Sequence, residues 1–185
     1  MKLLKDIASK HVANLLTDNH IVAIYQGRSE AGPRALGNRS FLMSPMNKDN
    51  KNIMNVMKGR EMFRPLAASV LQQEASKWFD MLGMKESPYM TFSFKCIGDK
   101  NLIPAVIHED GSCRIQTVTK KQNENYYKII ESFYKKTKVP MLLNTSLNLA
   151  GDALVETPED ALETFEKSTI NYLYFPEERF LCEKP

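Results

Sequence analysis

The 185-residue chain is poor in the residues that build metal centres and disulfide frameworks. It has only three cysteines and three histidines, and both sets are widely spaced. An odd number of scattered cysteines argues against a disulfide scaffold, and so few histidines argue against a zinc site, so we expect a protein of the reducing cytoplasm with no metal ligands of its own. No apolar run approaches the ~18 residues of a membrane span. The first 16 residues are interrupted by charges, unlike a signal peptide. Membrane-embedded, secreted and zinc-module proteins are therefore excluded, and no membrane partner is expected.

The remaining composition is that of a folded domain, with 43% hydrophobic and 25% charged residues. The length predicts a single domain over residues 1–185. The net charge of +3 hides a gradient: residues 1–64 hold eleven Lys/Arg against five Asp/Glu, and residues 141–185 hold three against nine. This excess of cations early in the chain predicts an anion-binding surface, although a solvated basic face explains the charge equally well.

Hydrophobic periodicity predicts an α/β domain built on a mixed sheet. We expect helices over 2–17, 47–58, from 72 through Trp78 to Leu82, over 123–137, and after a helix start at 157–160. We expect strands over 21–25, 66–71, 89–96, 104–108, 114–118, 140–143, 171–175 and 179–183, with a hairpin turn at 109–112. The glycine-rich segment 27–40 is predicted to be an ordered loop, and the aromatic residues of 89–96 are predicted to lie mainly in the core.

Four segments carry side chains suited to binding an anion. They are the glycine-rich loop with Arg34 and Arg39, the Lys58-Gly-Arg60 segment followed by Arg64, the strand end Asn144-Thr-Ser146-Leu-Asn148, and the strand residue Arg114 near His108. Arginine offers a planar fork and lysine a compact charge for phosphate or carboxylate. Each segment also has a purely structural explanation: a turn, a basic helix C-terminus, local capping or an exposed sheet face. No nucleophile with a base, and no pair of carboxylates, can be assembled from the sequence, so the predicted chemistry is anion binding and polarisation.

Taken in order, four longer motifs are more specific than any single segment. GRSEAGPRALGNRSFLMSP, KGREMFRPLAASVL, PAVIHEDGSCRIQTV and LLNTSLNLAGDALVETPEDALETF follow one another along nearly the whole chain. Together they closely resemble the C-terminal domain of the O-carbamoyltransferase family, which includes nodulation-factor and antibiotic-tailoring carbamoyltransferases. The resemblance implies a YrdC-like fold, an open twisted mixed sheet with flanking helices, in which Lys58-x-Arg60 and Ser146-x-Asn148 match the signature of that superfamily.

The resemblance also implies an activity. Carbamoyl phosphate would be cleaved, and the carbamate would attack the α-phosphate of ATP, with Mg²⁺, to form carbamoyl-adenylate and release pyrophosphate. A separate N-terminal domain, in cis or in trans, would move the carbamoyl group to a hydroxyl of an acceptor. By this resemblance the phosphates are held by Lys58, Arg60 and Arg64, and a further phosphate or the carbamoyl end by Arg114.

The resemblance assigns the remaining polar residues as well. Ser146, Asn148 and Asn144 would contact the carbamate or the α-phosphate, and Arg34 and Arg39 would complete the pocket or face the partner domain. His108 is either a ligand-binding residue or a strand histidine with satisfied hydrogen bonds. Leu147 stands where the family usually has Phe, which bears on substrate fit.

Three other functions remain open on the sequence alone. A basic α/β surface can bind RNA through phosphate charge, with Tyr89, Phe92 and Phe94 as stacking faces. The domain could instead resemble threonylcarbamoyl-adenylate synthases, which act on threonine and bicarbonate, or it could be a docking domain without catalysis.

Overall fold

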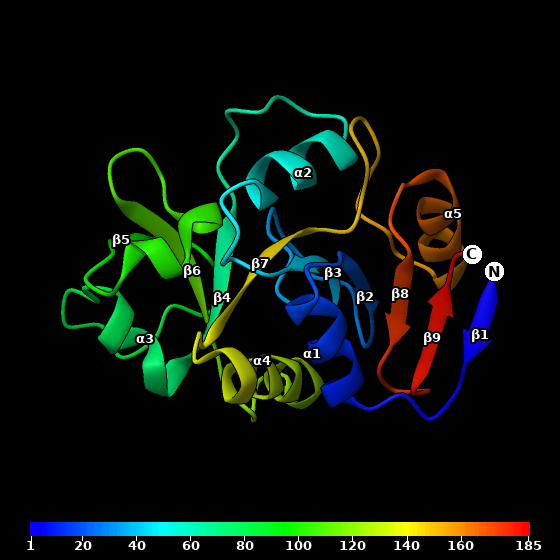
Figure 1. Cartoon of the computed structure of the whole chain (residues 1–185), viewed down its shortest axis with the longest axis horizontal. Helices are drawn as coiled ribbons and strands as arrows, with labels where there is room; N and C mark the ends of the chain where they lie inside the picture. The colour runs from blue at the N-terminus through cyan, green and yellow to red at the C-terminus, as the bar shows by residue number, and fades with distance from the viewer.

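A single nine-stranded mixed sheet runs the length of the molecule, as the computed structural model of all 185 residues shows (Figure 1). From one edge to the other the strands are β1 (Lys2–Leu4), β9 (Phe180–Glu183), β8 (Tyr172–Phe175), β2 (Val22–Tyr25), β3 (Arg39–Met43), β7 (Met141–Ser146), β4 (Ala67–Leu71), β6 (Ser112–Val118) and β5 (Ser93–Lys95). The β8–β2 and β4–β6 pairs are parallel and the other neighbours are antiparallel. The predicted fold class, an open mixed α/β sheet, is confirmed.

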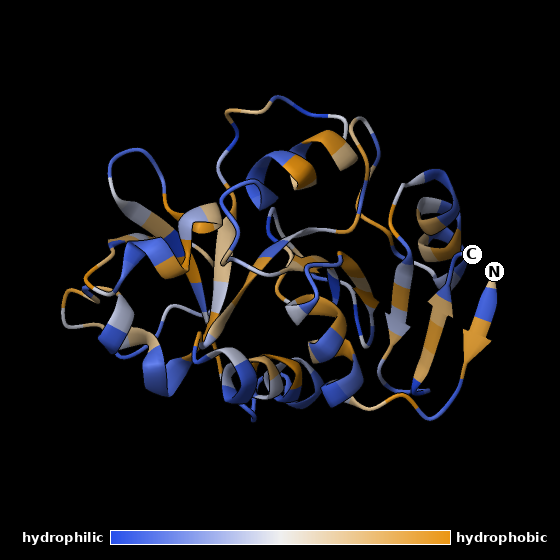
Figure 2. Cartoon of the chain, viewed as in Figure 1, coloured by the Kyte–Doolittle hydropathy of each residue, from blue (hydrophilic) through white to orange (hydrophobic).

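Five α-helices cover this sheet: α1 (Ser9–Thr17), α2 (Asn50–Met57), α3 (Gln72–Trp78), α4 (Glu124–Thr137) and α5 (Pro158–Lys167). Helices α1 and α4 pack side by side on one side of the central strands, and α2 lies on the other (Figure 1). Each helix carries alternating hydrophilic and hydrophobic segments (Figure 2), as expected for an element with one face on the core. The two chain ends lie together, because β1 pairs with β9.

The central strands form the most deeply buried part of the core, since every residue of β3 and β4 is buried. Helix α4 adds Tyr126, Ile129, Ile130 and Phe133 from one face, as its periodicity predicts. Helix α5 begins with the predicted capping structure: the Thr157 hydroxyl accepts the backbone N–H of Asp160, whose carboxylate accepts the N–H of Thr157. These local predictions are confirmed because each depends on contacts within one or two helical turns.

The predicted helix over 2–17 is wrong in its first part. Residues 2–4 form the edge strand β1, in which Leu3 pairs with Cys182, and Asp6 adopts a positive φ of 57° before α1 begins. Strand β3 was not predicted at all, because Arg39 and Ser40 at its start hide the apolar pattern that follows. Both β1 and β3 form because they pair with segments distant in the sequence.

The segment 104–108 was predicted as a strand, and this is wrong as well. Residues Pro104–Val106 form a 3₁₀ turn, and the Ala105 N–H donates to Pro45 O rather than to a sheet partner. The antiparallel partner of β6 is β5, so no hairpin joins 104–108 to 114–118.

The strand predicted over 89–96 shrinks to 93–95, because Met90 turns the chain with a positive φ of 53°. Phe94 is buried as predicted, whereas Tyr89 and Phe92 are 69% and 51% exposed. Helix α3 ends at Trp78, since Phe79 forms an isolated bridge with Cys96. On α2, Ile53 is exposed, whereas the adjacent Met54 is buried.

Candidate functional site

The Lys58 side chain joins the end of α2 to the loop that follows β7. It is 3% exposed, and its Nζ lies 5.2 Å from the centre of the Phe41 ring. The ammonium donates to Asn148 O at 2.6 Å, to Asn148 Oδ1 at 3.0 Å, and to the Ser146 carbonyl. None of these acceptors carries a charge, so the Lys58 charge is solvated but not neutralised. Burial, and secondly the charge of Arg60, lower the pKa of Lys58 to about 7.

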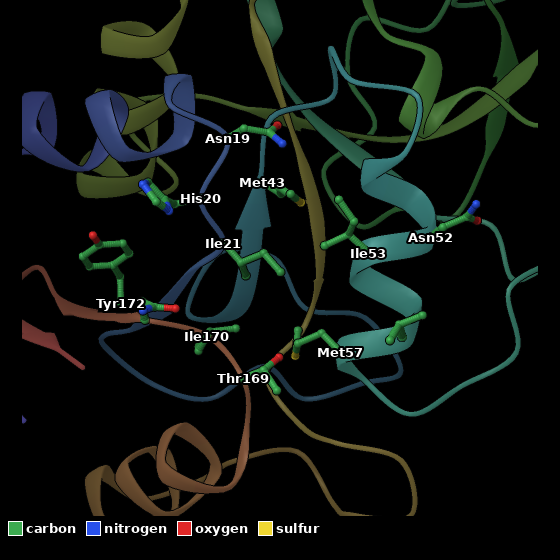
Figure 3. Close-up of a pocket in the computed structure, with 12 residues that line it drawn as sticks. Asn19, His20, Ile21, Met43, Asn52, Ile53, Met57, Thr169, Ile170 and Tyr172 are labelled. Atoms are coloured by element: carbon green, nitrogen blue, oxygen red, sulfur yellow. The ribbon is translucent and has the colours of Figure 1, made fainter. Parts of the chain in front are cut away.

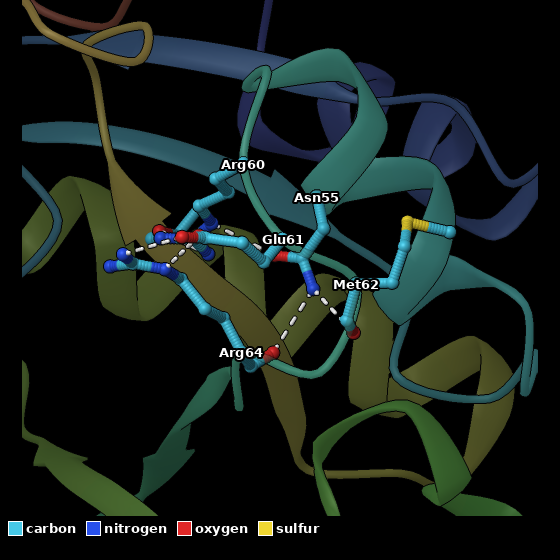
Figure 4. A network of polar contacts seen from close by, with 6 residues as sticks. Asn55, Arg60, Glu61, Met62 and Arg64 are labelled. Carbon is cyan, nitrogen blue, oxygen red and sulfur yellow. Dashed lines mark hydrogen bonds and ion pairs between the residues drawn. The ribbon is translucent and has the colours of Figure 1, made fainter.

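A buried asparagine of α2 organises the turn that presents the next cations (Figure 4). Asn55 Oδ1 accepts Arg60 Nε at 2.8 Å, and its Nδ2 donates to the carbonyls of Met62 at 3.2 Å and Arg64 at 3.0 Å. Arg64 is exposed and pairs with Glu61 at 2.5 Å, whereas no carboxylate pairs with Arg60. The unneutralised charge in this turn is therefore that of Arg60. The sequence did not predict this role of Asn55, because an asparagine inside a helix belongs to no recognisable motif.

Three arginines converge on a narrow cavity of about 90 Å³ between the end of β7 and the glycine-rich loop. Arg34 comes from that loop, Arg60 follows α2, and Arg114 projects from β6. The cavity is lined by Pro33, Arg34, Ala35, Arg60, Pro65, Leu66, Ala67, Met90, Arg114, Asn144, Thr145 and Ser146. No aspartate or glutamate is among them, so the positive charge of the arginines is uncompensated.

Arg114 is the clearest case of a cationic side chain without a partner inside the domain. Its Nε is fully buried and has no hydrogen-bond partner. Burial lowers the pKa of Arg114, and the charge of Arg34 lowers it further. The pKa of Arg60 is lowered by burial first and then by Arg64 and Arg114. A half-buried guanidinium held among like charges without a partner costs stability, which is the usual signature of a site built for an anion.

The narrow cavity shares lining residues with a wider hollow on each side. The hollow towards Lys58, of about 640 Å³, shares Arg60 and Ser146 with it. The hollow towards Tyr89, of about 690 Å³, shares Arg34 and Arg114. We call the three together the basic trough; its walls carry the cations Arg34, Lys58, Arg60, Arg64 and Arg114 and the carboxylates Glu30 and Glu61.

Strand β7 supplies the polar wall of the trough. Asn144 is buried, and its Nδ2 donates to Ser69 Oγ at 2.9 Å and to Ala35 O at 3.2 Å, which holds the glycine-rich loop against the sheet. The Ser146 hydroxyl donates to Asn148 Oδ1 at 2.7 Å. Leu147 is fully buried in the core, so the departure from the family at this position changes packing rather than the trough wall.

Two residues that the sequence analysis singled out lie outside the basic trough. Arg39 is 2% exposed and donates to the carbonyls of Gln26, Asn38, Gly27 and Glu156 at 2.6, 3.1, 3.2 and 3.1 Å. Its guanidinium also stacks on the Tyr25 ring at 3.6 Å. Arg39 therefore braces the base of the glycine-rich loop.

His108 lines a separate hollow of about 420 Å³ beside Phe63 and Asp110. Its Nε2 lies 3.3 Å from Leu66 O, and its Nδ1 lies 3.3 Å from the Ser112 hydroxyl. Both ring nitrogens thus have partners within the domain.

The structure contains no group of three or more His, Cys, Asp or Glu side chains arranged to hold a metal ion. None of its helices has the length and apolar character needed to cross a membrane.

The chain is similar to two nodulation proteins. It is 42% identical over 163 residues to nodulation protein NolO of Bradyrhizobium diazoefficiens, and 43% identical over 163 residues to nodulation protein NolNO of Sinorhizobium fredii. These matches cover 86% of the chain but only 30% and 24% of the two relatives. The chain thus spans less than a third of their length.

Solved structures of low sequence identity share the fold. P. abyssi Sua5, in complex with L-threonine, superposes with a TM-score of 0.62 at 13% identity, over 91% of this chain and 46% of Sua5. Full-length HypF in a phosphate- and nucleotide-bound form gives a TM-score of 0.60 at 16% identity, over 90% of this chain and 27% of HypF. These likenesses confirm the YrdC-like fold. The family model of the carbamoyltransferase C-terminus matches residues 13–184, so the chain belongs to the family of carbamoyltransferase C-terminal domains.

Proposed function

We propose that this domain binds ATP and carbamoyl phosphate in the basic trough and forms carbamoyl-adenylate. Water would cleave carbamoyl phosphate to carbamate and inorganic phosphate. A carbamate oxygen would then attack the α-phosphorus of ATP, and the bond from that phosphorus to the bridging oxygen of pyrophosphate would break. The observation that carries this proposal is the convergence of Arg34, Arg60 and Arg114 on one cavity without a carboxylate.

Electrostatics is the main task in such a reaction, because two polyanions meet in one site and negative charge moves onto the leaving group. We assign the pyrophosphate to the wide hollow at Lys58, Arg60 and Arg64, whose walls are mostly polar. Arg114 would hold a further phosphate or the carbamoyl end. Ser146 and Asn148 would hydrogen-bond the reacting carbamate or α-phosphate, and Asn144 would shape the cavity floor.

Cavity size supports this division of the trough. A volume of about 90 Å³ corresponds to roughly three water molecules at about 30 Å³ each. A carbamoyl group or a single phosphate fits there, whereas a nucleoside needs one of the wider hollows. The hollow beside Tyr89 has the more apolar walls of the two and suits a nucleoside better.

The trough does not offer a resident Mg²⁺ site. Glu61 pairs with Arg64, and Glu30 accepts the backbone N–H groups of Leu36 and Asn38 at 2.8 and 2.7 Å through Oε1, which leaves its buried Oε2 as a single carboxylate oxygen without a partner. Any Mg²⁺ would therefore arrive with ATP and be held by its phosphates, as is common for this ion. Transfer of the carbamoyl group to a hydroxyl acceptor is assigned to an N-terminal transferase domain, in cis or in trans.

Pyrophosphate exchange into ATP tests the proposal on the chain itself. Exchange should require carbamoyl phosphate and should be lost in Lys58→Met. Lys184→Met is a matched control, because Lys184 Nζ also donates to backbone carbonyls, at 2.6 Å to both Phe165 and Ser168, but lies outside the trough. Exchange that survives Lys58→Met, or that responds to threonine and bicarbonate instead of carbamoyl phosphate, would contradict the proposal.

Absence of exchange in the wild-type chain leads to a second measurement, calorimetric titration with ATP. Binding that Lys58→Met weakens and Lys184→Met preserves means that the transferase portion completes the site. Absence of both exchange and binding would leave a docking role.

Binding of single-stranded RNA is a second candidate, because Tyr89 and Phe92 are exposed and Tyr89 lines one end of the basic trough. Exposed aromatic faces beside cations are the usual platform for unstacked bases. RNA affinity would fall steeply with salt and would not respond to carbamoyl phosphate. A Tyr89→Ala variant that loses RNA binding but keeps pyrophosphate exchange would separate the two functions.

A further inference from the structure

A further hollow, of about 480 Å³, lies between α2 and the segment leading into β8 (Figure 3). Its apolar walls are Ile53 and Val56 of α2, Met43 at the end of β3, Ile21 before β2, and Ile170 before β8. We call it the α2 groove. Val56 is 64% exposed and Ile53 is 42% exposed, so α2 turns a row of branched apolar side chains to the solvent.

The α2 groove is notable for what its lining lacks. None of its twelve lining residues is Asp, Glu, Lys or Arg, although 25% of the chain is charged. The polar residues there are amides, a hydroxyl, a tyrosine and a histidine, including Asn19, Asn52 and His20. Depletion of charge around an apolar centre, with uncharged hydrogen-bonding groups beside it, is the composition of the buried centre of a protein interface.

The groove and the basic trough are built on the same helix. Ile53 and Val56 lie on the outer face of α2, which ends at Met57, and Lys58 follows at once and projects into the trough. A protein seated in the α2 groove would therefore lie within one helical turn of the proposed reaction site.

The length of the relatives indicates which protein segment would occupy the α2 groove. The chain matches 30% of NolO and 24% of NolNO, and the family model that it matches is that of a C-terminus. About 70% of NolO therefore belongs to a portion outside the matched region. Two domains of one chain typically bury about 600–1,500 Å² against each other, and the α2 groove would form the apolar centre of such an interface.

We propose that the α2 groove is the docking surface for the carbamoyltransferase portion that the relatives carry outside this domain. The proposal rests on the proposed function only for the identity of that partner. Val56 and Ile53 would enter an apolar depression of the partner, and the amides around them would bond its backbone.

A chimera tests this surface in a full-length protein. In it, this chain replaces the matched region of NolO from Bradyrhizobium diazoefficiens, and hydrogen exchange of the α2 amides is compared with that of the isolated chain. Contact should slow exchange in α2 about tenfold or more. Val56→Glu should abolish the protection, because a carboxylate would be buried without a partner. Ile97→Glu is the matched control, since Ile97 is 60% exposed but lies outside the groove.

Two results would overturn the proposal. The first is equal exchange of α2 in the chimera and the isolated chain. The second is an isolated chain that sediments as a dimer and becomes monomeric with Val56→Glu, because the occupant would then be a second copy.

If the chimera does not fold, co-expression of the isolated chain with the unmatched portion of NolO replaces it. Wild type and Ile97→Glu should then copurify with that portion and Val56→Glu should not; failure of the wild type to copurify also contradicts the proposal. Pyrophosphate exchange enters none of these readouts, so the docking surface and the proposed reaction can fail independently.

Discussion

The contrast between two inward-facing arginines provides a sharp test of which residues serve the site. The Nε atoms of Arg39 and Arg114 are both buried without a partner, but Arg39 donates through Nη1 and Nη2 to four backbone carbonyls and stacks on Tyr25, whereas the Arg114 guanidinium donates no hydrogen bond within the domain. The same substitution, Arg to Met, keeps an unbranched apolar stem and removes the guanidinium in each case. We expect opposite effects on stability, because the Arg39 guanidinium donates hydrogen bonds to the carbonyls around it, whereas the Arg114 guanidinium is repelled by Arg34.

The magnitudes follow from the number of interactions lost. Arg39→Met removes four hydrogen bonds and leaves the buried Gln26 carbonyl without this donor, so the free energy of unfolding should fall by about 2–4 kcal/mol. Arg114→Met removes no hydrogen bond and one uncompensated charge, so the free energy of unfolding should stay the same or rise by up to about 1 kcal/mol. A charge-assisted hydrogen bond to phosphate contributes about 1.5–3 kcal/mol, so Arg114→Met should weaken carbamoyl phosphate binding roughly 10- to 150-fold.

Two measurements on each variant test these expected changes in stability and affinity. Urea unfolding can be followed by the fluorescence of Trp78, the single tryptophan, and carbamoyl phosphate affinity by calorimetric titration. The reasoning is refuted if Arg114→Met lowers stability as much as Arg39→Met does. It is also refuted if Arg114→Met binds carbamoyl phosphate as tightly as the wild type.

Four further predictions concern other parts of the domain. Because the pKa of Lys58 is lowered from 10.5 to about 7, pyrophosphate affinity should fall as the pH rises through 7, and Lys58→Arg should abolish that dependence in the same titration. Between pH 7 and 10.5 the unfolded chain binds the Lys58 proton more tightly than the folded domain, so the free energy of unfolding should rise with pH in the wild type, and less in Lys58→Met. Gly37→Ala should destabilise the fold by about 3 kcal/mol or more in urea unfolding, because φ is +104° and the new Cβ would lie 2.2 Å from the Tyr126 ring. Thr157→Ala should cost about 1 kcal/mol of stability through the lost cap and leave pyrophosphate affinity unchanged; an altered affinity would contradict the placement of α5 away from the trough.

The elements that the sequence predicted well are those whose stability is local. Helix α4 follows from a 3.6-residue apolar period, and α5 follows from a capping box that closes within four residues. The elements it missed depend on a distant partner. Strand β1 exists because β9 lies beside it, and β3 exists because β2 and β7 enclose it on both sides.

The same distinction applies to the site. Lys58 and the Ser146-x-Asn148 segment were recognised as motifs, and the structure brings them into hydrogen-bond contact across 88 and 90 residues of chain. The sequence could not tell that Arg114 would line the basic trough while Arg39 would brace a loop. Both are strand arginines, and only the arrangement of neighbouring carbonyls separates them.

By itself the sequence determined the fold class, the excess of cations early in the chain and the family, because composition, periodicity and ordered motifs are properties of the chain. Only the tertiary structure decided which cations are neutralised, which hollows join into the basic trough, and that α2 exposes an uncharged groove. Those properties depend on which polar groups meet across the sheet. Strand pairing and burial decide which polar groups come into contact, and these groups belong to residues tens of positions apart. No local sequence pattern can therefore predict the contacts.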